Sequence, residues 1–289
     1  MSYFLFDTAK ILILLVVIIF IVSLIRSFFP VHRVKEILSK QHTITGHVAA
    51  GLLGIVTPFC SCSAVPLFLG FVEAGVPLGI TFTFLVASPM INEIALVMLI
   101  SLFGWKVSAL YIVSGLLVSI VAGMIIGKLK LESLVVNVGS GAEKSSVNYD
   151  RWSDRLRFAW RYTRMILGRV WIFVVMGVGV GAWIHGYVPT DLLAAYAGKG
   201  HWYAVPLAVL IGIPLYSNAA GVMPLVSALT EKGVAMGTAL AFMMAVTALS
   251  LPEFMILRRV MKTRLILIFA GIVGVGILIT GYLFNWVLG

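Results

Sequence analysis

Eight long apolar runs divide this chain, and they constrain its fold more than any other feature. Two of the runs, 44–73 and 204–230, are interrupted by polar residues. The other six are uninterrupted and long enough to cross a bilayer as helices. They lie at 9–28, 78–102, 107–127, 168–188, 235–257 and 265–286. Hydrophobic residues make up 61% of the chain and charged residues 11%, whereas a soluble domain carries about 25% charged residues. The sequence therefore predicts an all-α polytopic membrane protein.

Prolines and polar residues interrupt the middle of each broken run. Proline lacks an N–H group and clashes with the preceding helical turn. In hydrocarbon, broken backbone is tolerated only where protein buries it or where it lines a polar cavity. We interpret six prolines as breaks in hairpins or helices: Pro58, Pro66, Pro89, Pro214, Pro224 and Pro252.

The two broken runs match each other at a fixed offset of 158 residues. The matched positions include prolines, glycines and a glutamate, as in the pairs Gly54/Gly212, Pro66/Pro224, Glu73/Glu231, Gly75/Gly233 and Gly79/Gly237. With a further shift of two, Asn92-Glu93 falls opposite Pro252-Glu253. Internal duplication is typical of transporters. We therefore divide the chain into a first membrane repeat (1–128), a polar loop (129–163) and a second membrane repeat (164–289).

The distribution of positive charge decides between two topologies. If both broken runs cross the membrane, giving eight spanning helices of which two are broken, the two sides hold 11 and 10 Lys and Arg residues. If each broken run instead returns to the side it came from, the split becomes 17 to 4, as the positive-inside rule requires. Each arm is then about 10–12 residues, roughly half of the bilayer core. We predict six spanning helices, two re-entrant hairpins and inverted repeats in the cell membrane, with the central loop in the cytoplasm.

The polar loop and the net charge give further evidence for the class of membrane protein. We expect a short amphipathic helix within it, around Trp152 to Tyr162. The net charge of +10 arises from basic residues in loops, which favours membrane orientation over nucleic-acid binding. The first apolar run lacks a basic leader and a small-residue cleavage site, so we expect a retained span.

The tips of the two hairpins form the candidate substrate site. A returning arm begins near Ser63 in one hairpin and near Gly221 in the other, and helix N-termini favour anions. The polar side chains expected at the tips are Cys60, Ser61, Cys62, Ser63, Ser217 and Asn218. Thiolates prefer soft centres, such as trivalent arsenic. Residues i and i+2 share a side in extended backbone but can diverge in a turn, and the alternative is that both cysteines are small buried hydrophobic residues.

Two glutamates within apolar runs are candidates for coupling. Glu93 follows Ser88-Pro89, and Glu253 follows Pro252. Burial of an ionisable group in a membrane is costly, so such a residue is a functional candidate. A structural hydrogen bond is the alternative role for Glu93, and an ion pair with Arg258 one helical turn away is the alternative for Glu253.

Other chemistry finds little support in the sequence. The histidines show no metal-ligand spacing, and the methionines are expected to pack the core. No nucleotide-binding motif is present, so we expect a transporter that is not an enzyme and needs no cofactor or metal. The expected partners are a small-molecule substrate and the lipid bilayer, and a homo-oligomer is compatible with the sequence.

The stretch Thr57-Pro-Phe-Cys-Ser-Cys-Ser-Ala-Val-Pro66, with Ser88-Pro-Met-Ile-Asn-Glu93 after it, resembles the ArsP-type predicted permeases. The second half, from Gly212-Ile-Pro-Leu-Tyr216 to Ser250-Leu-Pro-Glu253, is also similar to that family. The resemblance implies an inner-membrane permease, and characterised relatives export trivalent organoarsenicals. The family often has a glycine where this chain has Ser63.

Two other classes remain open. An anion carrier, for a sulfur oxyanion for example, would use the N–H groups at the tips and tolerate replacement of cysteine by serine. A membrane thiol-redox protein would need both cysteines to cycle, but the Cys-x-Cys spacing is tighter than that of common redox motifs.

Overall fold

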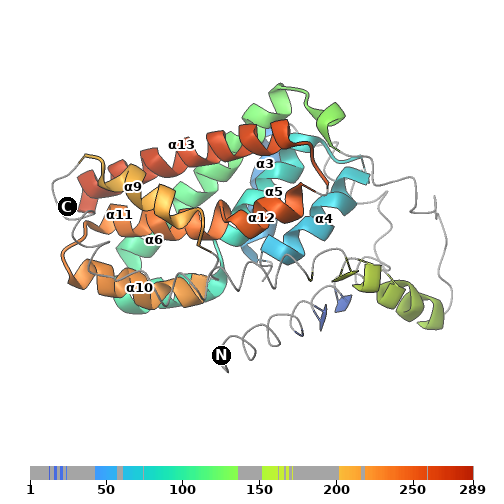
Figure 1. Ribbon diagram of the computed structural model, residues 1–289, viewed down its shortest axis with the longest axis horizontal. Coiled ribbons are helices and arrows are strands. Elements are labelled where there is room, and N and C mark those ends of the chain that lie inside the picture. The colour runs from blue at the N-terminus through green and yellow to red at the C-terminus, as the bar shows by residue number, and fades with distance from the viewer. Residues whose placement is uncertain are drawn as a thin grey trace.

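The computed structural model describes most of the helical bundle (Figure 1). The described residues are 43–56, 61–73, 75–135, 152–161, 202–215, 219–258 and 260–288, with short pieces or single positions at 13, 16–17, 20–21, 24, 163–165, 167–168 and 171. Within these residues the fold is all-α, apart from isolated bridge residues such as Val135 and Met261, which form an antiparallel bridge. The predicted spans 9–28 and 168–188 lie almost entirely outside the described residues.

The first half of the bundle consists of α3 (Thr43–Val56), α4 (Ser61–Glu73), α5 (Leu78–Met90) and α6 (Glu93–Lys128). Helix α3 runs parallel to α5, because His47 contacts Thr83 while Gly54, further along α3, packs against Ala87, further along α5. The chain must therefore return between them, and α4 provides that return. Helices α3 and α4 form a hairpin against α5, as the sequence predicts.

A tight turn joins α4 to α5. Gly75 has a φ of 75°, and its N–H donates to the Val72 carbonyl at 2.9 Å while the Val76 N–H donates to the Phe71 carbonyl at 2.9 Å. This pair of hydrogen bonds is the Schellman motif, which favours glycine at the left-handed position. The turn places the end of α4 beside the start of α5, so the hairpin begins and ends at one end of the bundle.

The second half repeats this arrangement. It consists of α9 (Ala204–Gly212), α10 (Ala219–Glu231), α11 (Met236–Ala248), α12 (Leu251–Leu257) and α13 (Thr263–Leu288). Both α10 and α11 have the bounds of α4 and α5 moved by 158 residues. Gly233 forms the same Schellman turn, with a φ of 87° and hydrogen bonds from Gly233 to Thr230 and from Val234 to Leu229.

Close backbone contacts between helices also recur at the offset of 158. A β-carbon added at Gly79 would lie 2.5 Å from the Gly123 carbonyl oxygen. In the second half, one added at Gly237 would collide with the Gly281 carbonyl oxygen. These glycines let α5 approach α6, and α11 approach α13, more closely than a side chain allows. The repeat therefore extends beyond the broken runs into the long helices.

Two of the predicted spans are not continuous, which corrects the sequence interpretation. The run 78–102 breaks at Ile91-Asn92, between α5 and α6, and the run 235–257 breaks at Leu249-Ser250, between α11 and α12. Each break lies close to a proline, Pro89 or Pro252, which cannot donate the hydrogen bond that a continuous helix would need at that position. Hydropathy alone shows neither break, whereas the sequence interpretation did mark Pro89 and Pro252 as breaks.

Helix α6 is itself interrupted at Gly104, where φ is 81° and ψ is 174°. This position falls in the gap predicted between the runs 78–102 and 107–127. Tyr111 and Gly115, early in the second part of α6, contact Met90 at the end of α5, whereas Gly123, near the end of α6, contacts Gly79. The second part of α6 therefore runs back along α5.

The equivalent long helices α6 and α13 pack against each other in opposite directions. Val118 lies against Gly276. A short 3-10 helix, η1 (Glu132–Leu134), follows α6. The Lys262 N–H, just before α13, donates to the carbonyl of Leu134, the last residue of η1, at 2.9 Å, so the start of α13 lies near the end of α6. Residues that differ by 158, such as Val118 and Gly276, thus meet across the contact. The two long helices therefore run antiparallel to each other.

The bundle has two chemically different ends. Lys128, Lys130, Lys262 and Arg264 gather where α6 ends and α13 begins, which we call the basic end. At the other end, which we call the aromatic end, the Tyr282 hydroxyl donates to the Trp202 carbonyl at 2.6 Å. Figure 1 shows α4 toward one end of the long axis and α10 toward the other.

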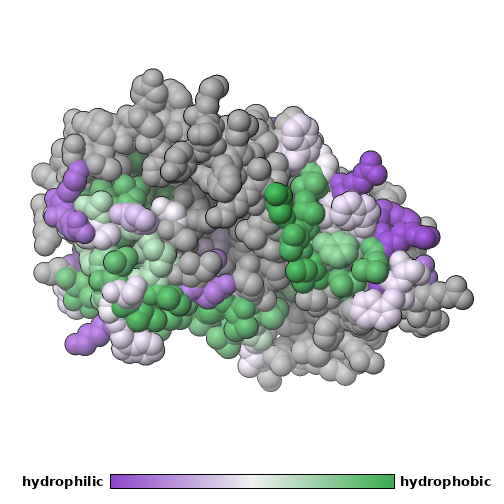
Figure 2. All heavy atoms as spheres, turned by 90° about the horizontal axis from the view of Figure 1, so that it is seen from below, coloured by the Kyte–Doolittle hydropathy of each residue, from purple (hydrophilic) through white to green (hydrophobic). Residues whose placement is uncertain are grey.

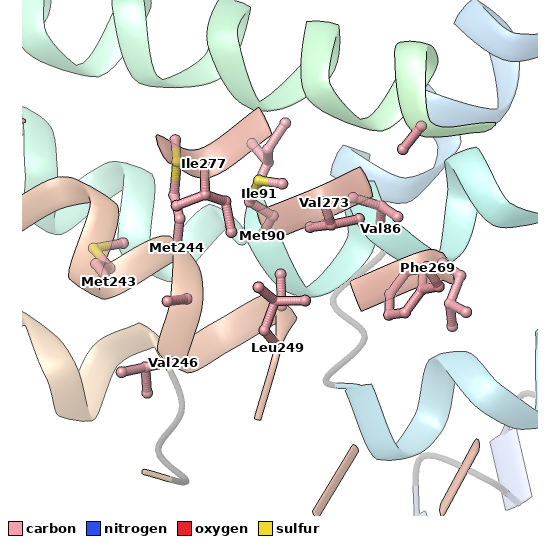
Figure 3. Packing of buried hydrophobic residues seen from close by; sticks show 14 of the residues in the cluster. Val86, Met90, Ile91, Met243, Met244, Val246, Leu249, Phe269, Val273 and Ile277 are labelled. Carbon is pink, nitrogen blue, oxygen red and sulfur yellow. The ribbon is translucent and has the colours of Figure 1, made fainter. Parts of the chain in front are cut away.

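Three described stretches are long and apolar enough to span a bilayer: Ala95–Lys128, which includes the interruption at Gly104, Met236–Met255, which includes the break at Leu249-Ser250, and Thr263–Leu288. The interior is apolar. Figure 3 shows buried side chains of α5, α11 and α13, among them Met90, Met244 and Phe269, filling the region where the halves meet.

Candidate functional site

The predicted substrate site lies between the arms of the two hairpins. Helix α3 ends at Val56 and α4 begins at Ser61, while α9 ends at Gly212 and α10 begins at Ala219. Each returning arm thus begins two residues earlier than the sequence suggested. Ser61, Cys62 and Ser63 form the first turn of α4, although their side chains are not described.

Other predicted tip residues fall outside the described part of the chain. These are Pro58, Cys60, Ser217 and Asn218. Their contribution to the site therefore stays a prediction. What the structure does describe is the pair of helices that brackets each tip, and both returning helices, α4 and α10, are 13 residues long.

The five predicted break prolines that the structure describes behave differently from one another. Pro214 follows α9 at the second tip, and Pro89 is buried near the end of α5. Pro66 and Pro224 are not breaks, because each is the sixth residue of a continuous helix, α4 or α10. A proline there removes one hydrogen bond close to the helix N-terminus, where part of the ladder is absent already. Pro252 is the second residue of α12, a position that tolerates a missing N–H.

Both candidate glutamates lie in the first turn of a helix that follows a break. Glu93 is the first residue of α6, and its Oε2 atom is buried with no hydrogen-bond partner in the described part of the chain. Glu253 is the third residue of α12 and is 1% exposed. Acidic side chains are favoured at helix N-termini. The breaks therefore place two carboxyl groups inside the bundle at the start of half-length helical segments.

The second tip contacts the second break directly. The Leu251 N–H, at the start of α12, donates to the Ile213 carbonyl at 2.9 Å, just past the end of α9. In the first half, Gly54 packs against Phe84 and Ala87, near the end of α5. Hairpins and breaks also meet across the halves, because α4 packs on α12 and α10 packs on α6.

A buried polar pair in the first half, His47 and Thr83, was missed by sequence reasoning. His47 is 2% exposed, and its Nδ1 lies 2.7 Å from the Thr83 hydroxyl. The same hydroxyl donates to the Gly79 carbonyl at 3.2 Å, so this buried polar pair is also tied to the backbone of α5. The repeat offset contained a signal, since it pairs His47 with Val205.

In the part of the chain that is described, no group of three His, Cys, Asp or Glu side chains could hold a metal ion. The buried methionines Met90, Met223, Met243 and Met244 belong to the hydrophobic core, where thioethers fill irregular space.

Helices broken at half length, paired hairpins and buried carboxyl groups in an apolar bundle are features of a polytopic membrane transport protein. Residues 1–286 match the ArsP-type predicted permease family. The chain therefore belongs to that family.

Named relatives cover most of the chain at low identity. A UPF0718 protein of Methanocaldococcus jannaschii is 23% identical over 91% of this chain and 91% of its own length. The UPF0718 protein YraQ of Escherichia coli is 23% identical over 90% of this chain and 73% of its own length. A Streptococcus mutans protein named as a subunit of a two-component membrane permease complex is 25% identical over 86% of this chain and 84% of its own length. No solved structure matches the chain significantly.

Proposed function

We propose that this permease exports a small thiophilic solute, such as a trivalent organoarsenical, and binds it at the tip that carries Cys60 and Cys62. The observation that carries the proposal is the start of α4 at Ser61, which puts Cys62 in the first turn of a helix inside the bundle. A helix N-terminus favours the thiolate over the thiol.

The chemistry of binding is thiol exchange. A thiolate at the tip attacks trivalent arsenic, forms an arsenic–sulfur bond, and displaces the thiolate on which the substrate arrived, which leaves and takes up a proton. No change in oxidation state is needed. Two cysteines on one arsenic would exchange twice, and soft sulfur ligands favour this centre over hard oxyanions such as arsenate.

Glu93 is our candidate for coupling transport to proton movement. The proposal is supported by the buried position of its Oε2 atom at the start of α6. Burial of an ionisable group in an apolar bundle is costly, so a carboxyl group kept there is a candidate for proton coupling. Glu253, in the first turn of α12, is the second candidate.

We place the basic end of the bundle in the cytoplasm, with the repeats 1–128 and 164–289 inverted in the cell membrane around the loop 129–163. Support comes from the antiparallel packing of α6 and α13 and from the gathering of Lys128, Lys130, Lys262 and Arg264 at one end. Exposed Trp202 and Trp286 at the other end suit an interfacial aromatic belt.

A carrier of a small sulfur-containing or other anion is the second candidate function. It is favoured by the two helices, α4 and α10, that begin at the tips, because their free N–H groups would bind an anion. In this case Ser217 and Asn218 would contribute, and the cysteines would only fill space.

The deciding experiment measures uptake of trivalent methylarsenical into inside-out vesicles that contain wild type or Cys60→Ser/Cys62→Ser. We expect the double variant to lose this transport, since serine has similar volume but is a poor soft ligand. Ser227→Ala, outside the site, should transport normally. Full activity of a correctly inserted double variant would overturn the thiol mechanism, and retained sulfite uptake would then favour the anion carrier.

A further inference from the structure

The central loop contains a helix, residues 152–161, whose exposed face is unlike that of a soluble helix. Trp152, Leu156 and Trp160 are 63%, 43% and 57% exposed. Their spacing of four residues places them on one stripe of the helix. Ala159, on the border of this stripe, and Thr163, just past the helix, are buried, so the C-terminal part of the segment also faces protein.

Basic residues border this apolar stripe. Arg157, Arg161 and Arg164 are exposed, and at about 100° per residue they form a second stripe about a quarter turn from the first. Arg155 lies on the other border and is partly buried, while Asp154 is the acidic residue of the segment. An apolar face bordered by arginines is the pattern of a helix that lies in the plane of a membrane interface.

The location of the helix agrees with that pattern. Trp160 packs edge-on against Phe20, with ring centroids 6.4 Å apart, and Phe20 belongs to the first apolar run. Figure 1 shows the helix beyond α4, at the end of the long axis opposite α9 and the C-terminus. Figure 2 shows hydrophilic atoms at that end beside pale and apolar residues.

We propose that the helix 152–161 lies in the bilayer surface at the basic end and binds anionic phospholipid headgroups. The tryptophans and Leu156 would enter the boundary between headgroups and acyl chains, while Arg157, Arg161 and Arg164 would pair with phosphates. A bilayer is the favoured occupant over a soluble protein, because the chain is embedded in one and the arginines complement its anionic surface. This inference is independent of the transported substrate.

The test uses the full-length chain in phosphatidylcholine vesicles, with or without phosphatidylglycerol. The fluorescence of wild type minus that of Trp152→Phe/Trp160→Phe gives the emission of these two residues. With phosphatidylglycerol, brominated acyl chains should quench that emission and iodide should not reach it. Quenching by the lipid should be severalfold lower in phosphatidylcholine alone, at high salt, or in Arg157→Gln/Arg161→Gln/Arg164→Gln.

The matched control is Trp202→Phe/Trp286→Phe at the aromatic end, where both tryptophans are exposed. Quenching of the emission of Trp202 and Trp286 by brominated lipid should be the same with and without phosphatidylglycerol. Equal shielding of Trp152 and Trp160 with and without phosphatidylglycerol would overturn the proposal. Shielding that follows the ratio of protein to lipid instead would also overturn it, because a second copy of the chain would then cover the helix.

Discussion

The two halves of the bundle share a backbone but differ in chemistry. Their hairpins end in the same Schellman turn at Gly75 and Gly233. Equivalent glycines also lie where α5 contacts α6 in the first half and where α11 contacts α13 in the second. Yet His47 and Thr83 of the first half correspond to Val205 and Ala241 of the second. The described helices have similar positions in the two halves, while these buried polar groups differ from half to half.

The two breaks are also held in different ways. In the first half, the buried Tyr111 hydroxyl donates to the carbonyl of Met90, the last residue of α5, at 2.8 Å. The equivalent of Tyr111 is Phe269, which has no hydroxyl. In the second half, the Leu251 N–H binds the carbonyl of Ile213 at the hairpin tip. A break conserved in shape can therefore be stabilised by a side chain in one half and by backbone in the other.

The largest effect that we expect is the loss of transport on replacement of Glu93, the buried carboxyl group at the break of the first half. Glu93→Gln keeps the shape of the side chain but removes the titratable charge, so transport should be lost while insertion and folding stay normal. Uptake in vesicles across a pH range measures this effect. Glu231→Gln, at the exposed end of α10, is the control. Wild-type transport with an unchanged pH profile would reduce Glu93 to a structural residue.

The next effect concerns the backbone that both halves share. Gly79→Ala and Gly237→Ala should each destabilise the bundle by about 1–3 kcal/mol, because the added methyl meets backbone atoms that cannot move away separately. Gly271→Ala is the control, since nothing lies within 4 Å of its added β-carbon. Thermal unfolding in detergent measures all three. A large loss in one half alone would show that the halves are not equivalent in packing.

The smallest effect concerns the hydrogen bond that holds the first break. Tyr111→Phe gives the first half the residue type of the second and should lower stability by about 1 kcal/mol, since the Met90 carbonyl loses a buried donor. Tyr282→Phe removes a hydrogen bond at a more exposed position and should change stability less. The same unfolding assay compares them, and an equal loss in both variants would mean that burial at the break adds nothing.

Much of the fold could be predicted because membrane burial leaves clear traces in sequence. Gly75, Gly79 and Gly104 lie at a turn, a close helix contact and a helix interruption, respectively. The sequence match at an offset of 158 residues allowed the second hairpin to be predicted from the first. The helix at 152–161 also agrees with the predicted amphipathic segment. For the glycines a backbone requirement restricted the residue type, and for this helix the spacing of apolar and basic residues gave the prediction.

The rest was concealed because apolar residues do not distinguish a continuous helix from two half-length ones. The breaks at Ile91-Asn92 and Leu249-Ser250 lie in unbroken apolar sequence, and only the nearby prolines hinted at them. Pro66 and Pro224 gave the opposite error, because helices α4 and α10 continue through them. For the candidate site, the sequence identified which polar side chains are expected at the hairpin tips. The positions of Cys60, Ser217 and Asn218 stay predictions.

The central claim is that each hairpin returns to the end from which it starts, in opposite orientations in the two halves. Cysteine labelling tests it most directly, with single cysteines introduced into Cys60→Ser/Cys62→Ser. We predict that Glu73→Cys and Lys128→Cys react from the cytoplasmic face, and that Lys106→Cys and Lys232→Cys react from the outside. Labelling of positions 73 and 128 from opposite faces would contradict the account and favour eight spanning helices.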